Sequence, residues 1–246
     1  MIEELERFYQ EKENLINANG ANENLQKAKN AFNIESNKAK YSYNFEWMGR
    51  PIIAYPQDMI AMQELIWEIK PDLIIEAGIA HGGSLVYYAS ILELIGGEGL
   101  VLGLDIDIRK HNRELIEAHP MYKRIQMIEG DSCSMEVAEQ VYDIAKQKAK
   151  IIVCLDSNHT HDHVLKELQL YSKLVTIGSY CVVFDTVVED MPPDYLEGGR
   201  PWNPGNNPKT AVGQFLKEND NFAIDRTIDN KILVSVAPGG YLRRNK

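Results

Sequence analysis

Hydrophobic residues gather in five short runs along the middle of the chain, separated by stretches in which apolar positions recur at helical spacing. The runs lie at 73–77, 100–105, 125–129, 150–155 and 180–184. The helical stretches lie near 57–69, 84–95, 110–118, 134–148 and 161–175. Strands that are apolar on both faces and separated by helices predict an α/β fold, with a parallel sheet covered by helices on both sides.

The pattern changes toward the C-terminus. A helix is expected near 208–218, and the apolar runs "FAIDRTI" and "KILVSVA" follow it. Only Asp229 and Asn230 separate these two runs, and two residues close a hairpin but cannot make a parallel crossover. Five parallel strands plus a C-terminal antiparallel hairpin is the order of a Rossmann-like, seven-stranded methyltransferase sheet. A dinucleotide-binding dehydrogenase more often continues with βα units.

Two regions lie outside this alternation. Residues 1–40 are polar and helix-prone, and 41–58 are rich in aromatics and proline, so we expect an N-terminal helical and extended appendage over residues 1–56 that covers the cofactor site. We expect residues 57–246 to form the domain for which this strand order predicts a methyltransferase sheet. The loop at 186–207 is too long for a bare connection, which predicts a lid or an acceptor-binding role.

Composition narrows the class of partner. The formal net charge of -10 disfavours a nucleic-acid ligand, and a small molecule or a neutral glycan suits the surface better. No run of apolar residues is long enough for membrane insertion. The three cysteines, Cys133, Cys154 and Cys181, are widely spaced and indicate reduced thiols, which places the protein in the cytoplasm. Apolar and aromatic residues in the N-terminal arm are compatible with a homo-oligomer.

A glycine-rich turn follows the first strand in "IIEAGIAHGGS". Gly78, Gly82 and Gly83 allow backbone N–H groups to approach a ligand at the carboxyl end of the strand. Glu76 would repel a pyrophosphate but attract the ammonium group of S-adenosylmethionine. The same letters also fit G-x-A-x-x-G, a variant of the dinucleotide fingerprint that includes Ala80. The turn alone therefore leaves both cofactors open.

Acidic residues also follow the next strands. Asp105 ends the second strand, where it can accept hydrogen bonds from ribose hydroxyls, and Asp131 follows the third, where it can read an adenine amino group. Asp156 closes the fourth strand, and His159 lies three residues later. This pair suits O-methyl transfer, in which a base removes a proton from a hydroxyl whose oxygen then attacks the sulfonium methyl group.

Several motifs together resemble the cephalosporin hydroxylase and rhamnosyl O-methyltransferase-like family of S-adenosylmethionine-dependent methyltransferases. They are "WMGRPIIAYPQDM", "IIEAGIAHGGS", "LGLDID", "DSNHTHDHV", "RPWNPGNNPKTAVGQFL" and "NKILVSVAPGGYL". The resemblance spans about residues 41–244 and implies an O-methyltransferase that acts on sugars of antibiotics, capsules or lipopolysaccharide. The residues it assigns to the cofactor are Glu76, Gly78, Ala80, Gly82, Ser84, Asp105 and Asp131.

The same resemblance implies a divalent ion such as Mg²⁺. Asp156 is then a metal ligand and His159 the base. Two further polar ligands follow the fifth strand in the family, where this chain has Phe184 and Asp185. Phenylalanine cannot ligate a metal, so Asp185 either completes a weaker site with Asp156 or orients the substrate or His159.

The long loop and the N-terminal arm supply candidate substrate and cover residues. Arg200, Trp202 and Asn206 suit a sugar acceptor, because Trp stacks on sugar faces while Arg and Asn bind hydroxyls or phosphates. They equally suit an oligomer interface. Tyr43, Trp47 and Arg50 are expected to cover the cofactor, although packing explains the two aromatic residues as well.

Three hypotheses follow for function. The first is an S-adenosylmethionine-dependent O-methyltransferase acting on a sugar or related small metabolite, with His159, Asp156 and Asp185 as catalytic residues. The second is an NAD-dependent oxidoreductase, motivated by "GIAHGG" and Asp105. The third is a non-catalytic binding protein that retains the fold, motivated by Phe184.

Overall fold

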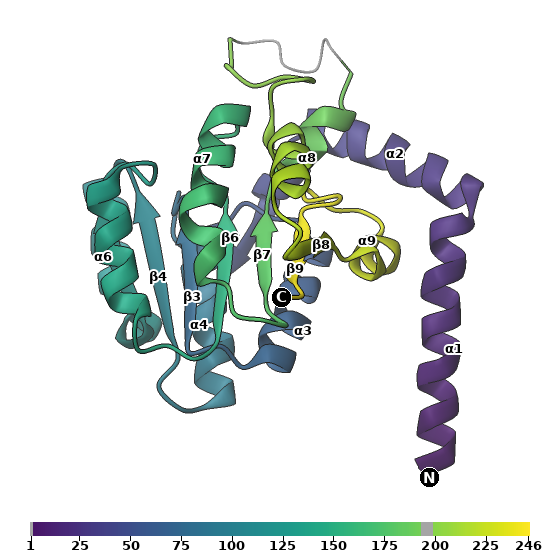
Figure 1. Cartoon of the computed structure of the whole chain (residues 1–246), viewed down its shortest axis with the longest axis horizontal. Coiled ribbons are helices and arrows are strands. Elements are labelled where there is room, and N and C mark those ends of the chain that lie inside the picture. The colour runs from purple at the N-terminus through teal and green to yellow at the C-terminus, as the bar shows by residue number, and fades with distance from the viewer. Residues whose placement is uncertain (1, 193–198) are drawn as a thin grey trace.

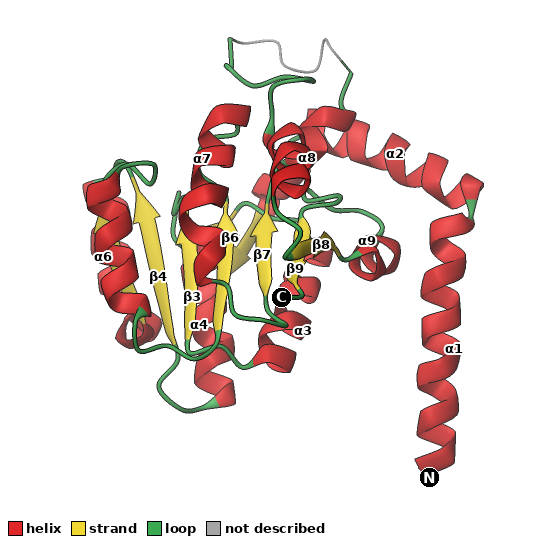
Figure 2. Ribbon diagram, in the orientation of Figure 1, coloured by secondary structure: helices red, strands yellow, loops and turns green. Residues whose placement is uncertain are grey.

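One seven-stranded sheet forms the centre of the computed structural model, which describes residues 2–192 and 199–246. The strand order is β5-β4-β3-β6-β7-β9-β8. The first five strands of this order are parallel, namely β3 (Leu73–Ala77), β4 (Leu100–Asp105), β5 (Ile125–Glu129), β6 (Ile151–Leu155) and β7 (Tyr180–Val183). All five lie where the apolar runs predicted them. Helices flank the sheet on both sides (Figure 2).

Alternate residues of each strand face two separate hydrophobic cores. In β3, Ile74 packs in one core, while Leu73, Ile75 and Ala77 pack in the other, and all four are fully buried. The first core is covered mainly by α3 (Pro56–Ile69) and α4 (Gly83–Ile95). The second is covered by α6 (Met135–Ala145), α7 (His161–Tyr171) and α8 (Pro208–Glu218). A strand with a core on each face reads as a continuous apolar run, which is the pattern seen in the sequence.

The last strand is antiparallel, as expected, but the predicted hairpin is wrong in its position. β8 (Phe222–Ile224) is followed by a short helix, α9 (Arg226–Ile232), and β9 is Tyr241–Arg244 rather than "KILVSVA". β9 lies between β7 and β8 and is antiparallel to both. The fold class therefore stands, whereas α9 and a loop replace the two-residue turn.

The N-terminal segment has helical and extended parts. α1 (Ile2–Ala21) and α2 (Glu23–Lys38) are joined at Asn22, whose side chain caps α2 by accepting the N–H of Leu25 at 3.1 Å. A short 3₁₀ turn and a two-stranded sheet, β1 (Phe45–Trp47) and β2 (Arg50–Ile52), then lead into α3. α1 contacts α9 along part of its length but otherwise stands apart from the body (Figure 1). No described helix is both long and apolar enough to cross a membrane.

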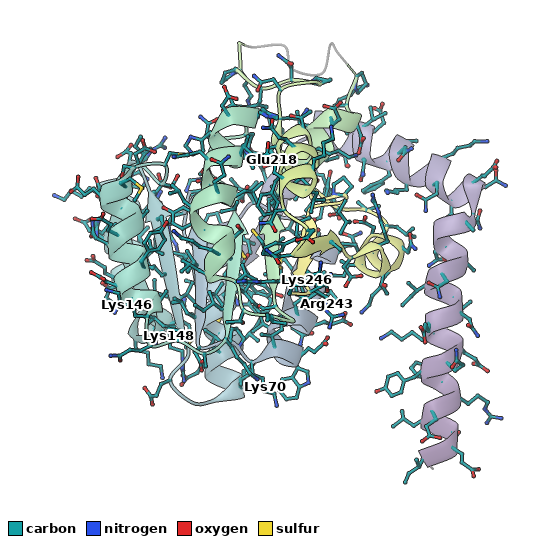
Figure 3. The ribbon with its side chains drawn as sticks, viewed as in Figure 1. Lys70, Lys146, Lys148, Glu218, Arg243 and Lys246 are labelled. Atoms are coloured by element: carbon teal, nitrogen blue, oxygen red, sulfur yellow. The ribbon has the colours of Figure 1, made fainter. Side chains whose placement is uncertain are left out.

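The carboxyl ends of the parallel strands meet at one edge of the sheet, beneath the described parts of the predicted loop, residues 186–192 and 199–207 (Figure 1). Of this predicted loop, residues 193–198 lie outside the described part of the chain. α5 (Lys110–Glu117) follows β4 at the same edge. Lys70 and Lys148 lie toward the opposite end, where the strands begin (Figure 3). The functional site is therefore sought at the carboxyl edge, where open α/β sheets bind ligands.

Candidate active site

The glycine-rich turn between β3 and α4 requires glycine for two different reasons. Gly78 has φ +93°, and a Cβ built there collides with the backbone carbonyl of Asp156 on the neighbouring strand end. A Cβ built on Gly83, at the start of α4, would collide in the same way with the backbone carbonyl of Pro51. Gly82 precedes α4 with φ +77°. The three glycines thus let the turn fit between β6 and the N-terminal segment.

Asp105 holds this turn in place. Its Oδ2 accepts the backbone N–H of Ile79 at 2.8 Å and that of Ala80 at 3.4 Å, while Oδ1 accepts the N–H of Asp107 at 3.1 Å. Ala80 has φ +47°, and the hydrogen bond from its N–H helps to hold this unusual conformation. Asp105 is half-buried at the edge of the sheet and lines neither of the two pockets described below.

A first pocket opens beside the turn and encloses about 620 Å³, part of it open to solvent. Gly83 lines it, as do five of the residues predicted for the cofactor or for catalysis, namely Glu76, Gly78, Ala80, Ser84 and Asp156. Glu76 is 1% exposed, and its Oε2 accepts the hydroxyl of Ser84 at 2.6 Å. Tyr88 also hydrogen-bonds to this carboxyl group. Burial raises the pKa of Glu76 to about 8, which leaves it largely neutral at pH 7 without a cationic ligand.

The N-terminal segment covers the first pocket, but through residues that sequence reasoning did not single out. Residues 51–54 line the pocket. Arg50 instead donates its Nε to the carbonyl of His81 at 3.0 Å and its Nη2 to Asn112 at 3.1 Å, which fastens β2 to the turn. Trp47 packs edge-on against Tyr87. Tyr43 lines the second pocket.

Asp58 is a second buried carboxyl group in the first pocket and was missed by sequence reasoning. It accepts the hydroxyls of Ser235 at 2.6 Å and Tyr241 at 2.8 Å and the N–H of Val236 at 2.9 Å. Burial raises its pKa to about 6 despite these three donors. The available signal was its position on α3, where it shares the buried stripe with Met62 and lies one turn before it.

A second pocket adjoins the first, and both are lined by Ile53, Ala80, Asp156 and Val236. It encloses about 1000 Å³, partly open to solvent. His159, Asp185, Arg200 and Trp202 also line it. The residues predicted for catalysis and two of those predicted for substrate binding therefore share one pocket.

Asp156, His159 and Asp185 form a carboxylate cluster in the second pocket. One potential ligand atom from each lies within 4.8 Å of the others. His159 Nε2 lies 3.2 Å from Asp185 Oδ2. Burial, followed by the charge of Asp185, raises the pKa of Asp156 well above its ordinary value. Two facing carboxyl groups of this kind either share a proton or gather around a cation.

Backbone conformation places the third member of the cluster. Asp185 follows β7 with φ +54° and precedes the 3₁₀ turn Thr186–Asp190. Phe184 is buried, lines the first pocket and donates its N–H to the carbonyl of Leu155 at 3.0 Å. Its ring thus contributes an apolar wall. Asp156 and Asp185 are left as the two oxygen ligands of the carboxylate cluster.

The long loop returns over His159. The ring of Trp202 meets the imidazole edge-on, with centroids 4.8 Å apart, and the guanidinium of Arg200 lies 5.3 Å from the Trp202 ring. Asn206, predicted to bind substrate, does not line the second pocket, and its side chain bonds to backbone groups of the protein. Its Oδ1 accepts the N–H of His161 at 2.9 Å and its Nδ2 donates to the carbonyl of Pro201 at 2.9 Å, so it ties the loop to the start of α7.

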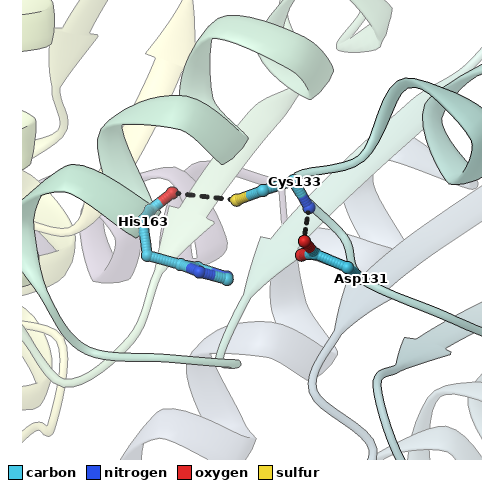
Figure 4. A group of neighbouring side chains, drawn as sticks. All are labelled: Asp131, Cys133 and His163. Atoms are coloured by element: carbon cyan, nitrogen blue, oxygen red, sulfur yellow. Dashed lines mark hydrogen bonds between the residues drawn. The ribbon is translucent and has the colours of Figure 1, made fainter.

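Asp131 lies apart from both pockets. It is exposed, its Oδ1 accepts the N–H of Cys133 at 2.9 Å, and its neighbours are Cys133 and His163 (Figure 4). Together with Asp105 it remains at the carboxyl edge. The structure therefore brings Glu76 and Asp156 to the pockets and leaves two of the four strand-end acids on the rim.

Comparison with known proteins identifies relatives over most of the chain. A family model described as Rhamnosyl O-methyltransferase/CmcI matches residues 39–245. A rhamnosyl O-methyltransferase of Mycobacterium tuberculosis is 33% identical over 190 residues, which cover 76% of this chain and 73% of that protein. The Mycobacterium leprae protein of the same name is 30% identical over 202 residues, covering 80% and 82%.

A solved structure of CmcI, described with Mg and SAM, has the same fold. Its TM-score is 0.58 at 20% identity, and the match covers 83% of this chain and 78% of that one. The predicted seven-stranded methyltransferase sheet is thereby confirmed. The match to the family model over residues 39–245, together with the two mycobacterial relatives, shows that the chain belongs to the rhamnosyl O-methyltransferase/CmcI family, as its motifs indicated.

Proposed function

We propose that this protein is an S-adenosylmethionine-dependent O-methyltransferase that acts on a hydroxyl of a sugar or related small metabolite in glycan or secondary-metabolite biosynthesis. One observation carries the proposal: two pockets adjoin at Asp156, with Glu76 in the first and His159 in the second. Because the two pockets share lining residues, a substrate in one lies next to a substrate in the other, and the two can react directly. Family membership supports the class of reaction.

The first pocket suits the methyl donor. Glu76, buried at the end of β3, attracts the ammonium group of the methionine moiety, and Ser84 and Tyr88 hold its carboxyl group in position. Gly78 and Ala80 expose backbone at the turn. Asp105 and Asp131 remain on the rim where an adenosine would extend. The solved CmcI structure described with Mg and SAM supports this choice of cofactor.

The second pocket suits a sugar acceptor. Trp202 offers an aromatic surface beside His159, and Arg200 is the only cationic Lys or Arg side chain among the described residues that line the pocket. An Arg there can bind hydroxyls, or a phosphate if the acceptor is nucleotide-activated. The mycobacterial relatives are named for rhamnosyl groups, which supports a deoxysugar acceptor.

His159 removes the proton from the acceptor hydroxyl in this mechanism. The oxygen attacks the sulfonium methyl group in line, the C–O bond forms as the C–S bond breaks, and S-adenosylhomocysteine leaves. Asp185, at 3.2 Å from His159 Nε2, orients the imidazole and stabilises the imidazolium that forms. The pocket walls contribute by holding both substrates at reacting distance.

The carboxylate cluster also fits a divalent ion. Asp156 and Asp185 are the residues that would hold it, and its charge would offset both the burial and the repulsion from Asp185 that raise the pKa of Asp156. Bound Mg²⁺ would supply Lewis-acid polarisation of the acceptor oxygen. With Phe184 in place of a polar residue, Asp156 and Asp185 would be the two carboxylates that hold the ion.

Assembly and compartment are parts of the same proposal. The exposed apolar side chains of α1, including Phe8 and Leu15, support a homo-oligomer in which a second copy covers this helix. Free cysteines, two of them buried, support the reducing cytoplasm as the site of action. An oxidoreductase is disfavoured, since the described residues that line the first pocket include the buried carboxyl groups of Asp58 and Glu76 but no Lys or Arg to bind the pyrophosphate of NAD.

Methyl transfer from isotopically labelled S-adenosylmethionine to a panel of acceptors tests the proposal. The panel contains a rhamnosylated glycolipid, a simple rhamnoside and a nucleotide-linked rhamnose, each assayed with Mg²⁺ and with EDTA. Product is expected with at least one sugar and is expected to be abolished by Asp156→Asn. Binding of NAD but not S-adenosylhomocysteine would contradict the proposal. Cofactor binding without transfer to any sugar would favour a non-catalytic protein.

A further inference from the structure

Outside the two pockets, a second group of potential metal ligands lies at the carboxyl edge of the sheet. We call Asp131, Cys133 and His163 the thiol cluster. Asp131 and Cys133 follow β5, and His163 is in the first turn of α7 (Figure 4). One potential ligand atom from each lies within 4.8 Å of the others. Segments that are thirty residues apart in sequence thus bring together an oxygen, a sulfur and a nitrogen donor.

The imidazole of His163 is held by its inner nitrogen. Nε2 lies 3.2 Å from the hydroxyl of Ser132, 3.1 Å from that of Ser157 and 3.3 Å from Oε1 of Glu167. Glu167 is fully buried, and the same oxygen accepts both hydroxyls, at 2.5 and 2.7 Å. The contacts of Nε2 with Ser132, Ser157 and Glu167 point this nitrogen into the protein, so Nδ1 is the nitrogen available to a ligand.

Glu167 has a further feature that points to a cation. Its second oxygen, Oε2, is buried and has no hydrogen-bond donor among the described residues. A buried carboxylate with an unpaired oxygen is stabilised by positive charge nearby. Metal-binding histidines commonly donate their other N–H to a carboxylate, which fixes the ring and strengthens the ligand. Glu167 stands in that relation to His163.

The donor types select the kind of ion. The carboxylate cluster offers mostly oxygen, which suits Mg²⁺, whereas a thiolate with an imidazole suits zinc and related transition metals. Three protein ligands leave a fourth position for water. Cys133 is partly exposed, so an ion can reach it from solvent.

We propose that Asp131, Cys133 and His163 bind a zinc-class divalent ion through a carboxylate oxygen, the thiolate sulfur and imidazole Nδ1, with water as the fourth ligand. In the metal-free protein the thiol of Cys133 lies 3.5 Å from the carbonyl of His163, which accepts its proton, and His163 pairs with Glu167. The ion replaces the thiol proton and the Nδ1 proton of the imidazolium, so binding releases two protons to solvent. Asp131 is shared with the adenosine end of the proposed cofactor site, so the metal site is assayed through the ion and not through methyl transfer.

Cobalt titration of the full chain tests the site, because a thiolate bound to Co²⁺ gives an intense near-ultraviolet charge-transfer band that oxygen and nitrogen ligands do not give. The band is expected in the native protein and in Asp156→Asn, which removes a ligand of the carboxylate cluster. It is expected to vanish in Cys133→Ser. Zn²⁺ is expected to abolish the band, and a large excess of Mg²⁺ to leave it. Glu167→Gln is expected to weaken Co²⁺ binding by about tenfold to a hundredfold.

Alkylation provides a measurement that needs no variant. Cys154 and Cys181 are buried, so iodoacetamide is expected to label Cys133 in the folded protein, and Zn²⁺ but not Mg²⁺ is expected to protect it. A native protein without the charge-transfer band, a band that persists in Cys133→Ser, or labelling that Zn²⁺ does not slow would each overturn the proposal. Those results would leave His163 as an ion-pair partner of Glu167 only.

Discussion

His159 Nε2 lies 3.2 Å from Asp185 Oδ2, which couples the histidine that follows β6 to the carboxylate that follows β7. Two residues that act as one unit give non-additive losses when they are changed. We expect His159→Ala to lower kcat by about 10²–10⁴-fold. Asp185→Asn should lower it less, and the double variant should be little worse than His159→Ala alone.

Steady-state kinetics of the three variants measure this coupling. His111→Gln is the matched control, because His111 is exposed and lines neither pocket. Losses that multiply in the double variant would show that Asp185 acts separately from His159, as a metal ligand does.

Binding of the methyl donor is expected to release a proton. Burial raises the pKa of Glu76 to about 8, so its carboxyl group is largely protonated at pH 7, and an ammonium ligand favours the ionised form. The heats of calorimetric titration in phosphate and in Tris at pH 7 should differ by nearly the difference between the ionisation enthalpies of the two buffers. Glu76→Gln should abolish this buffer dependence and weaken binding. Equal heats in both buffers with the native protein would contradict the assignment.

The same residue affects stability with a defined sign. The pKa of Glu76 is higher in the folded chain than its ordinary value of 4.5, so the folded state binds more protons between pH 4.5 and about 8. The contribution of Glu76 to the free energy of unfolding therefore falls as the pH rises through this range. Thermal melts without cofactor, recorded from pH 4.5 to 8, should show that the melting temperature falls less with rising pH in Glu76→Gln than in the native protein.

A methyl group at Gly78 is expected to disrupt the turn. Gly78→Ala forces alanine to φ +93° and brings its Cβ against the carbonyl of Asp156, so we expect a loss of at least about 1–2 kcal/mol and of cofactor binding. Gly213→Ala is the control. Gly213 is exposed on α8 with open space around it, and alanine there should stabilise the helix by about 0.5–1 kcal/mol. Denaturant unfolding compares the two.

Assembly can be tested on α1. Phe8 is 60% exposed and Leu15 65% exposed, so we expect Phe8→Glu with Leu15→Glu to shift the protein to a smaller species in light scattering after gel filtration. Gln10→Glu, exposed on the opposite face of the same helix, is the charge control. A native protein that is already monomeric at micromolar concentration would rule out this interface.

The parallel strands were predictable because a strand that is buried on both faces appears in the sequence as a short continuous run of apolar residues. β3 carries apolar residues toward each core, and β6 and β7 do the same. The last strand was misplaced because "KILVSVA" looks equally apolar. In the structure Ser235 and Val236 donate to Asp58, whereas Tyr241 and Leu242 enter the sheet. Which of the two segments becomes the strand depends on its pairing with β7 and β8, and the local sequence pattern does not indicate that pairing.

The site was predictable where strand ends determine it. Glu76, Asp156 and His159 line the pockets because parallel strands end at one edge. Asp105 and Asp131 also lie at that edge, but their side chains bind backbone N–H groups of Ile79 and Cys133. The direction of a side chain within a rim depends on turn geometry, which a single sequence does not reveal.

Arg50 donates to the carbonyl of His81, and the carbonyl of Pro51 lies against Gly83. The extended arm and the turn beside the first pocket are thus interlocked, although they are distant along the chain. A polypeptide trimmed to begin after Tyr55 would lose both fasteners and one wall of that pocket, whereas removal of α1 alone leaves them untouched. Anyone shortening this protein for crystals or for fusion to another enzyme should cut before Asn22, because α2 carries Asn37 of the second pocket and Ser36, which hydrogen-bonds to Tyr55.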